Sequence, residues 1–251
     1  MMAWSGRVIL LDIEGTVSEI AFVHQVLFPY ARQKVEGFLA SHLAQPEIQD
    51  VIELMAKDAG APHASSWCPF PIESPEGIAW LVQQVHAWMD RDAKLTGLKA
   101  LQGFVWESGY RDGSLRSHIF PEVPECLKRW TELGKTVTIY SSGSRAAQKL
   151  LFGHTTAGDL TPWISAYFDT TSGGKRELTS YQTIARQLGV PESSVLFLSD
   201  IPEELAAAAS AGMSTALVVR PGNRPTDDQK HPRIRSLDEI TVAKLPGSIP
   251  R

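Results

Sequence analysis

The hydrophobic positions of this chain form short continuous runs that alternate with longer segments of helical spacing. Five runs are apolar almost throughout and rich in β-branched and aromatic residues. They cover residues 7–12, 136–142, 166–170, 194–200 and 215–220. A strand with one exposed face would alternate apolar and polar residues, so these continuous runs predict strands covered on both faces, as in a parallel sheet.

Helical patterns follow most of these predicted strands. Four segments have apolar residues at helical spacing, and each ends in glycine. They cover residues 124–134, 145–153, 178–189 and 202–212. Glycine commonly ends a helix because it adopts the left-handed conformation without strain. The alternation of strands and helices predicts an α/β fold with a doubly wound, mainly parallel sheet of the Rossmann type.

A long segment after the first strand interrupts this alternation. It contains four helical patterns and a proline-rich loop, and no convincing strand. The helical patterns cover residues 22–43, 46–60, 78–92 and 95–110, and the loop covers 68–77. Because the sheet begins before this segment and resumes after it, we predict a core of residues 1–17 and 115–251 with a helical cap domain, residues 18–114, inserted after the first strand.

Composition excludes several classes of protein. The net charge of the 251-residue chain is -4 and no Lys/Arg-rich run occurs, so we expect neither a nucleic-acid partner nor an anionic membrane partner. The apolar runs are too short to cross a bilayer, and the N-terminus shows no export signal. Cys68 and Cys126 have no partners at metal-binding spacing. We therefore expect two unpaired thiols in a cytoplasmic protein, which we also expect to be monomeric.

Polar residues that could take part in catalysis or metal binding lie at the ends of three predicted strands or just after them. Asp12 and Glu14 follow the first strand, Ser141 and Ser142 end the second, and Asp200 ends the fourth. Ligands of open parallel sheets bind outside the carboxyl ends of the strands, so these side chains are predicted to face one crevice. Two carboxylates brought together would repel each other, and a bound cation would relieve that repulsion. Hard oxygen ligands favour Mg²⁺, which is often shared with a substrate phosphate.

The same crevice has candidate groups for binding and transferring a phosphate. The sequence YSSGS, which includes Gly143, offers hydroxyls and main-chain N–H groups at a helix N-terminus. Lys175 lies in the glycine-flanked loop DTTSGGKRE, where we expect it to bring a positive charge on a mobile tip. Asp12 is the candidate nucleophile because carboxylates form acyl phosphates, and Glu14 is placed to act as general acid and then as base.

Each of these features also has an ordinary structural interpretation. Asp12 and Glu14 could form a turn at the end of a strand, and YSSGS could be a helix-start loop. Lys175 could be a surface lysine, and Asp200 could cap the next helix. The placement of all four features at strand ends, in a consistent order along the chain, favours the functional interpretation.

Four motifs resemble those of haloacid dehalogenase-like (HAD) phosphatases. They are DIEGT, YSSGS, GGKRE and FLSDIPEE, in this order. Further segments, among them FVHQVLFPYAR, LKALQGFVW and VVRPGN, are similar to the enolase-phosphatases of methionine salvage over nearly the whole chain. Glutamate at position 14, where most of the superfamily has aspartate, is typical of this branch.

The resemblance implies a bifunctional, Mg²⁺-dependent enzyme with an HAD-like core. Its substrate would be the small phosphorylated diketone 2,3-diketo-5-methylthiopentyl 1-phosphate. The enzyme would enolise this diketone and then hydrolyse the phosphate through an aspartyl-phosphate, giving the acireductone 1,2-dihydroxy-3-keto-5-methylthiopentene.

The resemblance also implies a role for each motif residue. Asp12 would be nucleophile and metal ligand, and Glu14 would bind Mg²⁺ through its main-chain oxygen and supply acid/base function. Ser141 and Ser142 would hold phosphate, with Gly143 in support. Lys175 would bind substrate and act in catalysis. Two acids complete the set: Asp200 would be the second metal ligand, and Glu204 would support Asp200 or Lys175.

Some positions depart from the pattern or stay open. His24 stands where the family often has lysine, and the loop with His63, Trp67 and Cys68 matches no part of the family pattern. The base for enolisation could be Glu14, His24 or His86. Two other functions remain as alternatives: a generic HAD sugar-phosphate phosphatase, and a phospho-aspartate signalling module of the receiver type.

Overall fold

The computed structural model describes residues 1–245, and the chain divides into two compact units. The first unit contains Met1–Val23 together with the chain from Arg116 onward, and the second contains His24–Leu115. The division made from the sequence alone differs from this one in residues 18–23 and residue 115. In the following, each unit is described by itself.

The first unit is built on a six-stranded sheet in the order β4-β3-β2-β5-β6-β7, in which every neighbouring pair is parallel. Its strands are β2 (Val8–Leu11), β3 (Thr136–Tyr140), β4 (Ala166–Phe168), β5 (Val195–Ser199), β6 (Ser214–Val218) and β7 (Arg233–Ile234). The predicted α/β fold with a parallel sheet is confirmed. Strand β2 lies between β3 and β5, so the first strand of the sequence occupies the middle of the sheet.

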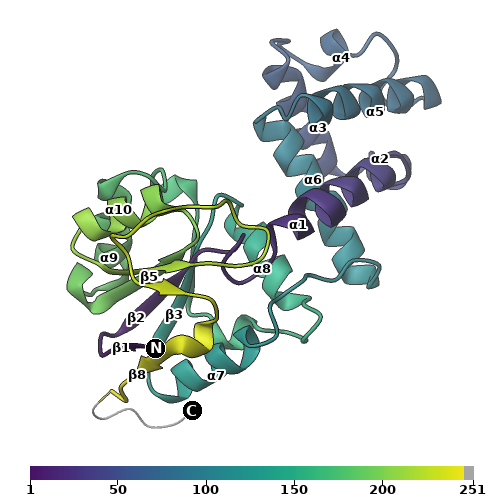
Figure 1. Ribbon diagram of the computed structural model, residues 1–251. Helices are drawn as coiled ribbons and strands as arrows, with labels where there is room; N and C mark the ends of the chain where they lie inside the picture. Colours follow the sequence, from purple (N-terminus) through teal and green to yellow (C-terminus); the bar gives the residue numbers. More distant parts are fainter. Residues whose placement is uncertain (246–251) are drawn as a thin grey trace. The chain divides into compact units, whose positions relative to one another are not determined.

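Helices cover both faces of this sheet, which explains the continuous apolar runs. Ile9 and Leu11 of β2 pack in one core cluster with residues of α7 (Val123–Glu132) and α8 (Arg145–Gly153). Val8 and Leu10 pack in another with residues of α9 (Leu178–Leu188) and α10 (Pro202–Ser210). Figure 1 shows these helices around the sheet. Since both side-chain directions of the strand meet apolar layers, no polar alternation remains in the sequence.

Three short strands were not predicted. β1 (Met2–Trp4) pairs in parallel with β8 (Ile240–Val242) in a separate two-stranded sheet, and β7 has only two residues. Strands of two or three residues are too short for a recognisable pattern.

Short helical turns complete the unit: α1 (Ile20–Phe22), η2 (Thr161–Trp163), η3 (Thr170–Ser172), η4 (Glu192–Ser194) and η5 (Leu237–Glu239). Lys135 fixes the chain between β1 and β2, because its Nζ donates to the carbonyl oxygen of Gly6 at 2.6 Å.

The second unit is helical throughout, as its sequence predicts. After a π-helical turn, η1 (Val23–Leu27), its helices are α2 (Phe28–His42), α3 (Pro46–Asp58), α4 (Ala64–Trp67), α5 (Pro75–Asp90) and α6 (Thr96–Asp112). Their apolar faces form one core cluster of their own.

The residues that match no part of the family pattern have structural roles in this unit. Trp67 packs edge-on to Trp80 at 4.8 Å between ring centroids and stacks on Trp88 at 5.4 Å. Cys68 is buried and free. The main-chain N–H of His63 donates to Ser66 Oγ at 3.3 Å, which closes the first turn of α4.

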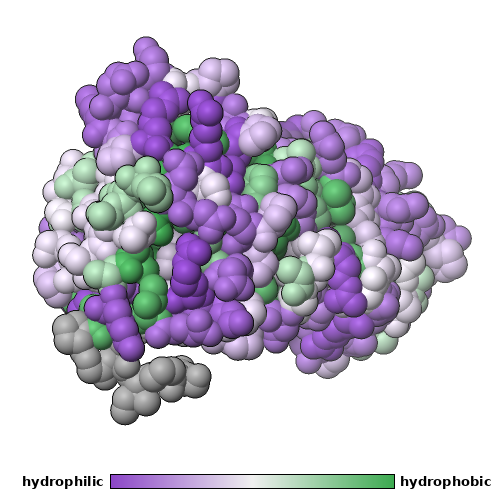
Figure 2. All heavy atoms as spheres, turned by 60° about the horizontal axis from the view of Figure 1, so that its bottom comes forward, coloured by the Kyte–Doolittle hydropathy of each residue, from purple (hydrophilic) through white to green (hydrophobic). Residues whose placement is uncertain are grey.

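Hydrophilic residues dominate the face shown in Figure 2, and hydrophobic residues appear mainly in narrow areas between them. Among residues 1–245, no helix is both long enough and apolar enough to cross a bilayer.

We expect Trp67→Ala to lower the free energy of unfolding of the helical unit by about 3 kcal/mol, the low end for truncation of a packed aromatic residue, because Trp67 is half-buried. Urea denaturation followed by circular dichroism measures this change. Ser65→Ala, at an exposed position of the same helix, is the control and should change little. Equal stability of the two variants would show that the tryptophan cluster does not support the unit.

Candidate active site

The turn after β2 places Asp12 at the centre of the sheet edge. The main-chain N–H of Asp12 donates to Leu198 of the adjacent strand β5 at 3.0 Å, and the Asp12 side chain is buried. The chain then folds back, since the N–H groups of Val17 and Ser18 both donate to the Ile13 carbonyl. Asp12 is therefore held as the last residue in register with the sheet, and Glu14, half-buried, lies in the turn.

Gly15 allows an acid from another strand to approach this turn. Its φ is +68°, in the left-handed region. A Cβ atom at Gly15 would lie 2.4 Å from Oδ2 of Asp200 and 2.8 Å from Oδ1 of Asn223. Asp200 comes from the carboxyl end of β5, so the acids that the sequence predicted at two strand ends flank the same turn.

Three consecutive carbonyl groups of the turn each accept a hydrogen bond from a residue far away in the sequence. The Gly15 oxygen accepts from Asn223 Nδ2 at 3.0 Å, and the Thr16 oxygen accepts from Arg220 Nη2 at 3.1 Å. The Val17 oxygen accepts from the main-chain N–H of Phe120 at 3.0 Å. The protein thus fixes the turn with groups from distant parts of the chain.

Sequence reasoning missed the part played by Arg220 and Asn223. Arg220 is buried, pairs with Glu122 and lies with its guanidinium 4.1 Å from the centroid of the Phe120 ring. Both residues belong to the segment VVRPGN, which resembles the family pattern. The sequence gives no role for them, because the burial of Arg220 and its partners are set by tertiary contacts.

Lys175 connects the nucleophile candidate to a second acid. Its Nζ lies 2.6 Å from Asp12 Oδ1 and 2.7 Å from Glu204 Oε2, and only 11% of its side chain is exposed. Burial alone would lower the pKa of Lys175, but the charges of Asp12 and Glu204 raise that pKa above its usual value. Lys175 therefore stays protonated, and its loop is not the mobile tip expected from the flanking glycines.

Three carboxylates, those of Asp12, Asp200 and Glu204, lie close enough to influence one another's protonation. Burial, followed by the charges of Asp12 and Glu204, raises the pKa of Asp200 to about 7. Burial and the charge of Asp12 also raise the pKa of Glu204, whose Oε2 accepts from Ser199 Oγ at 3.0 Å. One lysine does not balance three neighbouring carboxylates, so the cluster favours an additional positive charge.

The donor set fits a hard divalent cation. Asp12 and Asp200 offer carboxylate oxygens, and Oδ1 of Asn223 is buried without a hydrogen-bond partner within residues 1–245. The same part of the chain contains no group of three His, Cys, Asp or Glu side chains that could hold a metal ion by themselves. A cation here would need other oxygen ligands, such as a main-chain carbonyl, water or a phosphate, which suits Mg²⁺.

The serine loop follows β3, the strand next to β2. Gln148 shapes it by donating to the carbonyl oxygens of Gly143 at 2.7 Å and Phe168 at 2.8 Å. Ser141 is buried, and its Oγ accepts from the Gly143 N–H at 3.3 Å. Ser142 is exposed. Both serines therefore lie at the same edge of the sheet as Asp12.

The candidate histidines lie in the second unit. His86 Nε2 is 3.0 Å from the main-chain oxygen of Arg32, and the rings of His24 and Phe28 form a T-shaped pair with centroids 5.8 Å apart. The described contacts of both histidines are thus with residues of their own unit.

Comparison with known proteins identifies the family. The profile of haloacid dehalogenase-like hydrolases matches residues 7–212. The enolase-phosphatase E1 of Yersinia pseudotuberculosis is 43% identical, over 94% of this chain and 97% of the relative. The chain belongs to the enolase-phosphatase E1 family of haloacid dehalogenase-like hydrolases. The family resemblance inferred from the motifs is therefore confirmed.

A second relative and one solved structure are also similar over nearly the whole chain. The enolase-phosphatase E1 of Synechococcus elongatus is 45% identical over 92% of this chain and 96% of the relative. The crystal structure of the UTR4 protein from Saccharomyces cerevisiae superimposes with a TM-score of 0.75 at 36% identity, covering 92% of this chain and 98% of that one. The fold of that protein is thus shared over nearly the whole chain.

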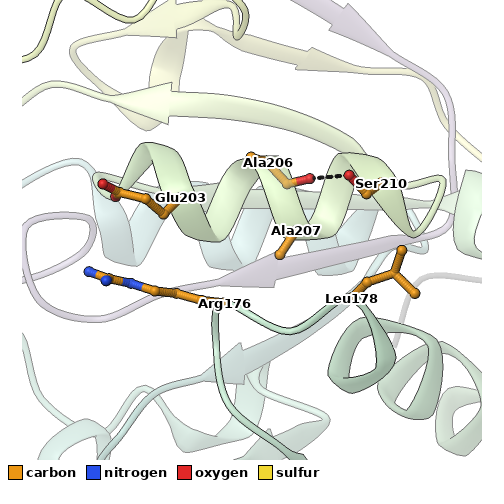
Figure 3. Close-up of a pocket in the computed structure, with 6 residues that line it drawn as sticks. All are labelled: Arg176, Leu178, Glu203, Ala206, Ala207 and Ser210. Carbon is orange, nitrogen blue, oxygen red and sulfur yellow. Dashed lines mark hydrogen bonds between the residues drawn. The ribbon is translucent and has the colours of Figure 1, made fainter.

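Two neighbours of the site residues in this family member face outward. Arg176 follows Lys175, and Glu203 precedes Glu204; both are exposed. They line a groove of about 430 Å³ together with Leu178, Ala206, Ala207 and Ser210 (Figure 3). Arg176 is adjacent to Lys175 in the chain and also carries a positive charge, but it lines the groove instead of contacting Asp12 and Glu204, which makes it a matched control for Lys175.

We expect Gly15→Ala to weaken Mg²⁺ binding by about 10-fold to 100-fold, because the new methyl group would displace the Asp200 carboxylate. Isothermal titration calorimetry with Mg²⁺ measures the effect. Gly60→Ala is the control: its φ of +83° carries the same backbone strain, but no atom lies within 4 Å of its Cβ position. Unchanged affinity in Gly15→Ala would mean that Asp200 does not contribute to a metal site.

Proposed function

We propose that this protein is a Mg²⁺-dependent enolase-phosphatase that enolises 2,3-diketo-5-methylthiopentyl 1-phosphate and then removes its phosphate. The observation that carries the proposal is the contact of 2.6 Å between Lys175 and Asp12, at the centre of the sheet edge, in a chain of the enolase-phosphatase family. The product would be the acireductone 1,2-dihydroxy-3-keto-5-methylthiopentene, an intermediate of methionine salvage.

Phosphate release would proceed through Asp12. An oxygen of Asp12 attacks phosphorus, and the bond between phosphorus and the substrate oxygen breaks. Glu14 donates a proton to the departing oxygen, and Glu14 then accepts a proton from a water molecule that attacks the acyl phosphate. The bond from phosphorus to Asp12 breaks, and inorganic phosphate leaves.

Lys175 and the serines would hold the group that is transferred. The protonated amine of Lys175 neutralises charge on the phosphoryl oxygens, while Ser141 and Ser142 donate hydrogen bonds from the end of β3. Glu204 accepts a hydrogen bond from Lys175 and fixes the direction of the amine. These groups come from three segments that end at the same edge of the sheet.

Asp12, Asp200 and the main-chain oxygen of Glu14 would hold Mg²⁺. Bound there, the cation supplies Lewis-acid stabilisation of negative charge on substrate oxygens. The acids that crowd this turn would then be balanced by a charge of opposite sign.

Enolisation needs a base and protection from bulk water. Among the three candidates, Glu14 is the one in the core unit, in the turn that follows Asp12, so we assign it the removal of the proton next to the carbonyl. We further propose that the helical insertion, residues 18–114, acts as a cap that excludes water during this step. The protein would act on its substrate as a cytoplasmic monomer.

The two partial reactions separate this proposal from a generic phosphatase. The diketone should give an ultraviolet absorbance of the enol before or together with free phosphate. Release of phosphate with no enolised species would favour a sugar-phosphate phosphatase instead. A stable acyl phosphate on Asp12, detected by mass spectrometry, would favour a signalling module.

We expect Asp12→Asn to abolish phosphate release but to keep part of the enolisation, because the amide cannot act as nucleophile yet leaves some oxygen ligands for the cation. A phosphate assay and the ultraviolet absorbance, recorded on the same sample, measure the two activities. Phosphate release at the parent rate would rule out Asp12 as the nucleophile.

We expect Lys175→Ala to lower kcat/KM for phosphate release by at least about 100-fold, as for other positioned electrostatic contacts. Arg176→Ala removes the adjacent positive charge and should leave kcat/KM close to that of the parent, since Arg176 faces the outer groove (Figure 3). Equal effects in both variants would mean that only the overall charge of the loop matters.

A further inference from the structure

Three consecutive carbonyl groups of the lysine loop each accept a hydrogen bond from a side-chain hydroxyl. The Gly173 oxygen accepts from Tyr140 Oη at 2.8 Å, and the Gly174 oxygen accepts from Ser180 Oγ at 2.8 Å. The Lys175 oxygen accepts from Tyr181 Oη at 2.6 Å. We call these three side chains, Tyr140, Ser180 and Tyr181, the hydroxyl set; all three residues are buried.

The sequence of the loop makes such support necessary. Two glycines precede Lys175, and Gly173 has a φ of +119°, so the main chain alone has wide conformational freedom. A long lysine side chain on a free loop would lose entropy each time it is brought to Asp12. With each carbonyl direction fixed, this loss occurs when the protein folds and not when the substrate binds.

The hydroxyl set comes from elements that also build the rest of the site. Tyr140 is the last residue of β3 and directly precedes Ser141, while Ser180 and Tyr181 lie in the first turn of α9. The rings of Tyr140 and Tyr181 meet edge to face at 5.6 Å between centroids. The lysine loop is thus tied to the same strand that delivers the serine of the phosphate site.

The packing around the set is tight. A Cβ atom at Gly173 would lie 2.1 Å from Ser180 Oγ, so the loop runs directly over the start of α9. Burial raises the pKa of both Tyr140 and Tyr181, so their hydroxyls remain donors. Lys175 Nζ also lies 5.9 Å from the centroid of the Tyr140 ring, within the range of a cation–π contact.

We propose that Tyr140, Ser180 and Tyr181 are positioning residues for phosphoryl transfer, which set the place of the Lys175 amine through the main chain of residues 173–175. The proposal rests on the proposed function, in which Lys175 stabilises the transferring phosphoryl group. The three hydroxyls donate to the main chain of residues 173–175. We therefore expect their removal to affect catalysis through the position of Lys175.

The test uses variants that remove one oxygen each and keep the rings. Tyr140→Phe and Tyr181→Phe should each lower kcat about fivefold, the factor expected for one neutral hydrogen bond, with little change in KM. Tyr167→Phe is the matched control, because Tyr167 Oη is buried and has no hydrogen-bond partner within residues 1–245. That control should keep the parent kcat. If either phenylalanine variant fails to fold, Ser180→Ala tests the third bond.

A double-mutant cycle separates positioning from a general loss of stability. In a Lys175→Ala background, removal of the Tyr140 or Tyr181 hydroxyl should lower kcat no further, because the group being positioned is gone. A full fivefold decrease in that background would overturn the proposal. So would a parent-like kcat in the single variants.

Hydrogen–deuterium exchange tests the loop without reference to activity. Amide exchange in residues 172–177 should become faster in Tyr140→Phe and Tyr181→Phe but not in Tyr167→Phe, and unchanged exchange would overturn the proposal. If the parent protein releases no phosphate, the proposed function fails separately. Weaker binding of inorganic phosphate to the phenylalanine variants then takes the place of kcat, and parent-like binding would overturn the positioning role.

Discussion

The site depends on one buried ion cluster, in which the amine of Lys175 joins Asp12 to Glu204. Taking these charges out of water is costly, and the cost is offset only if each charge has close partners. Lys175 alone cannot balance Asp12, Glu204 and the nearby Asp200, so the protein retains local negative charge at the edge of the sheet. In the proposed mechanism that excess is useful, because a divalent cation bound there would bring together the carboxylate proposed as nucleophile and an anionic substrate that would otherwise repel each other.

Two loops carry Asp12 and Lys175 of this cluster, and both are held by hydrogen bonds to three consecutive carbonyl groups. In the turn after β2, the carbonyls of residues 15–17 accept from Asn223, Arg220 and the main chain of Phe120. In the lysine loop, the carbonyls of residues 173–175 accept from buried hydroxyls. Glycine gives each loop the backbone freedom to pass close to a neighbour, and the hydrogen bonds then remove that freedom. The two loops can therefore present charged side chains with little disorder, which is the condition for electrostatic catalysis.

The sequence predicted the sheet, its covering helices and the placement of polar residues at strand ends, because these follow from periodicity and from the rule that parallel strands end at one edge. It could not predict β1, β7 and β8, which are too short for periodicity. β1 and β8 also pair across most of the chain. It also missed Arg220, Asn223, Tyr140 and Tyr181, since the partner of a buried polar side chain is decided by tertiary contacts. The expectation that Lys175 lies on a mobile tip was wrong for the same reason: adjacent glycines report the freedom of an isolated loop, not the hydroxyls packed behind it.

All the residues that donate hydrogen bonds to the carbonyls of these two loops belong to the unit formed by residues 1–23 and 116 onward. None of them belongs to the helical unit of residues 24–115. The inserted helices can therefore diverge in sequence, length or shape while the groups behind the reactive cluster remain intact. Such independence would let descendants of one ancestral chain acquire new substrates by exchanging a single contiguous segment, without rebuilding the machinery that transfers phosphate.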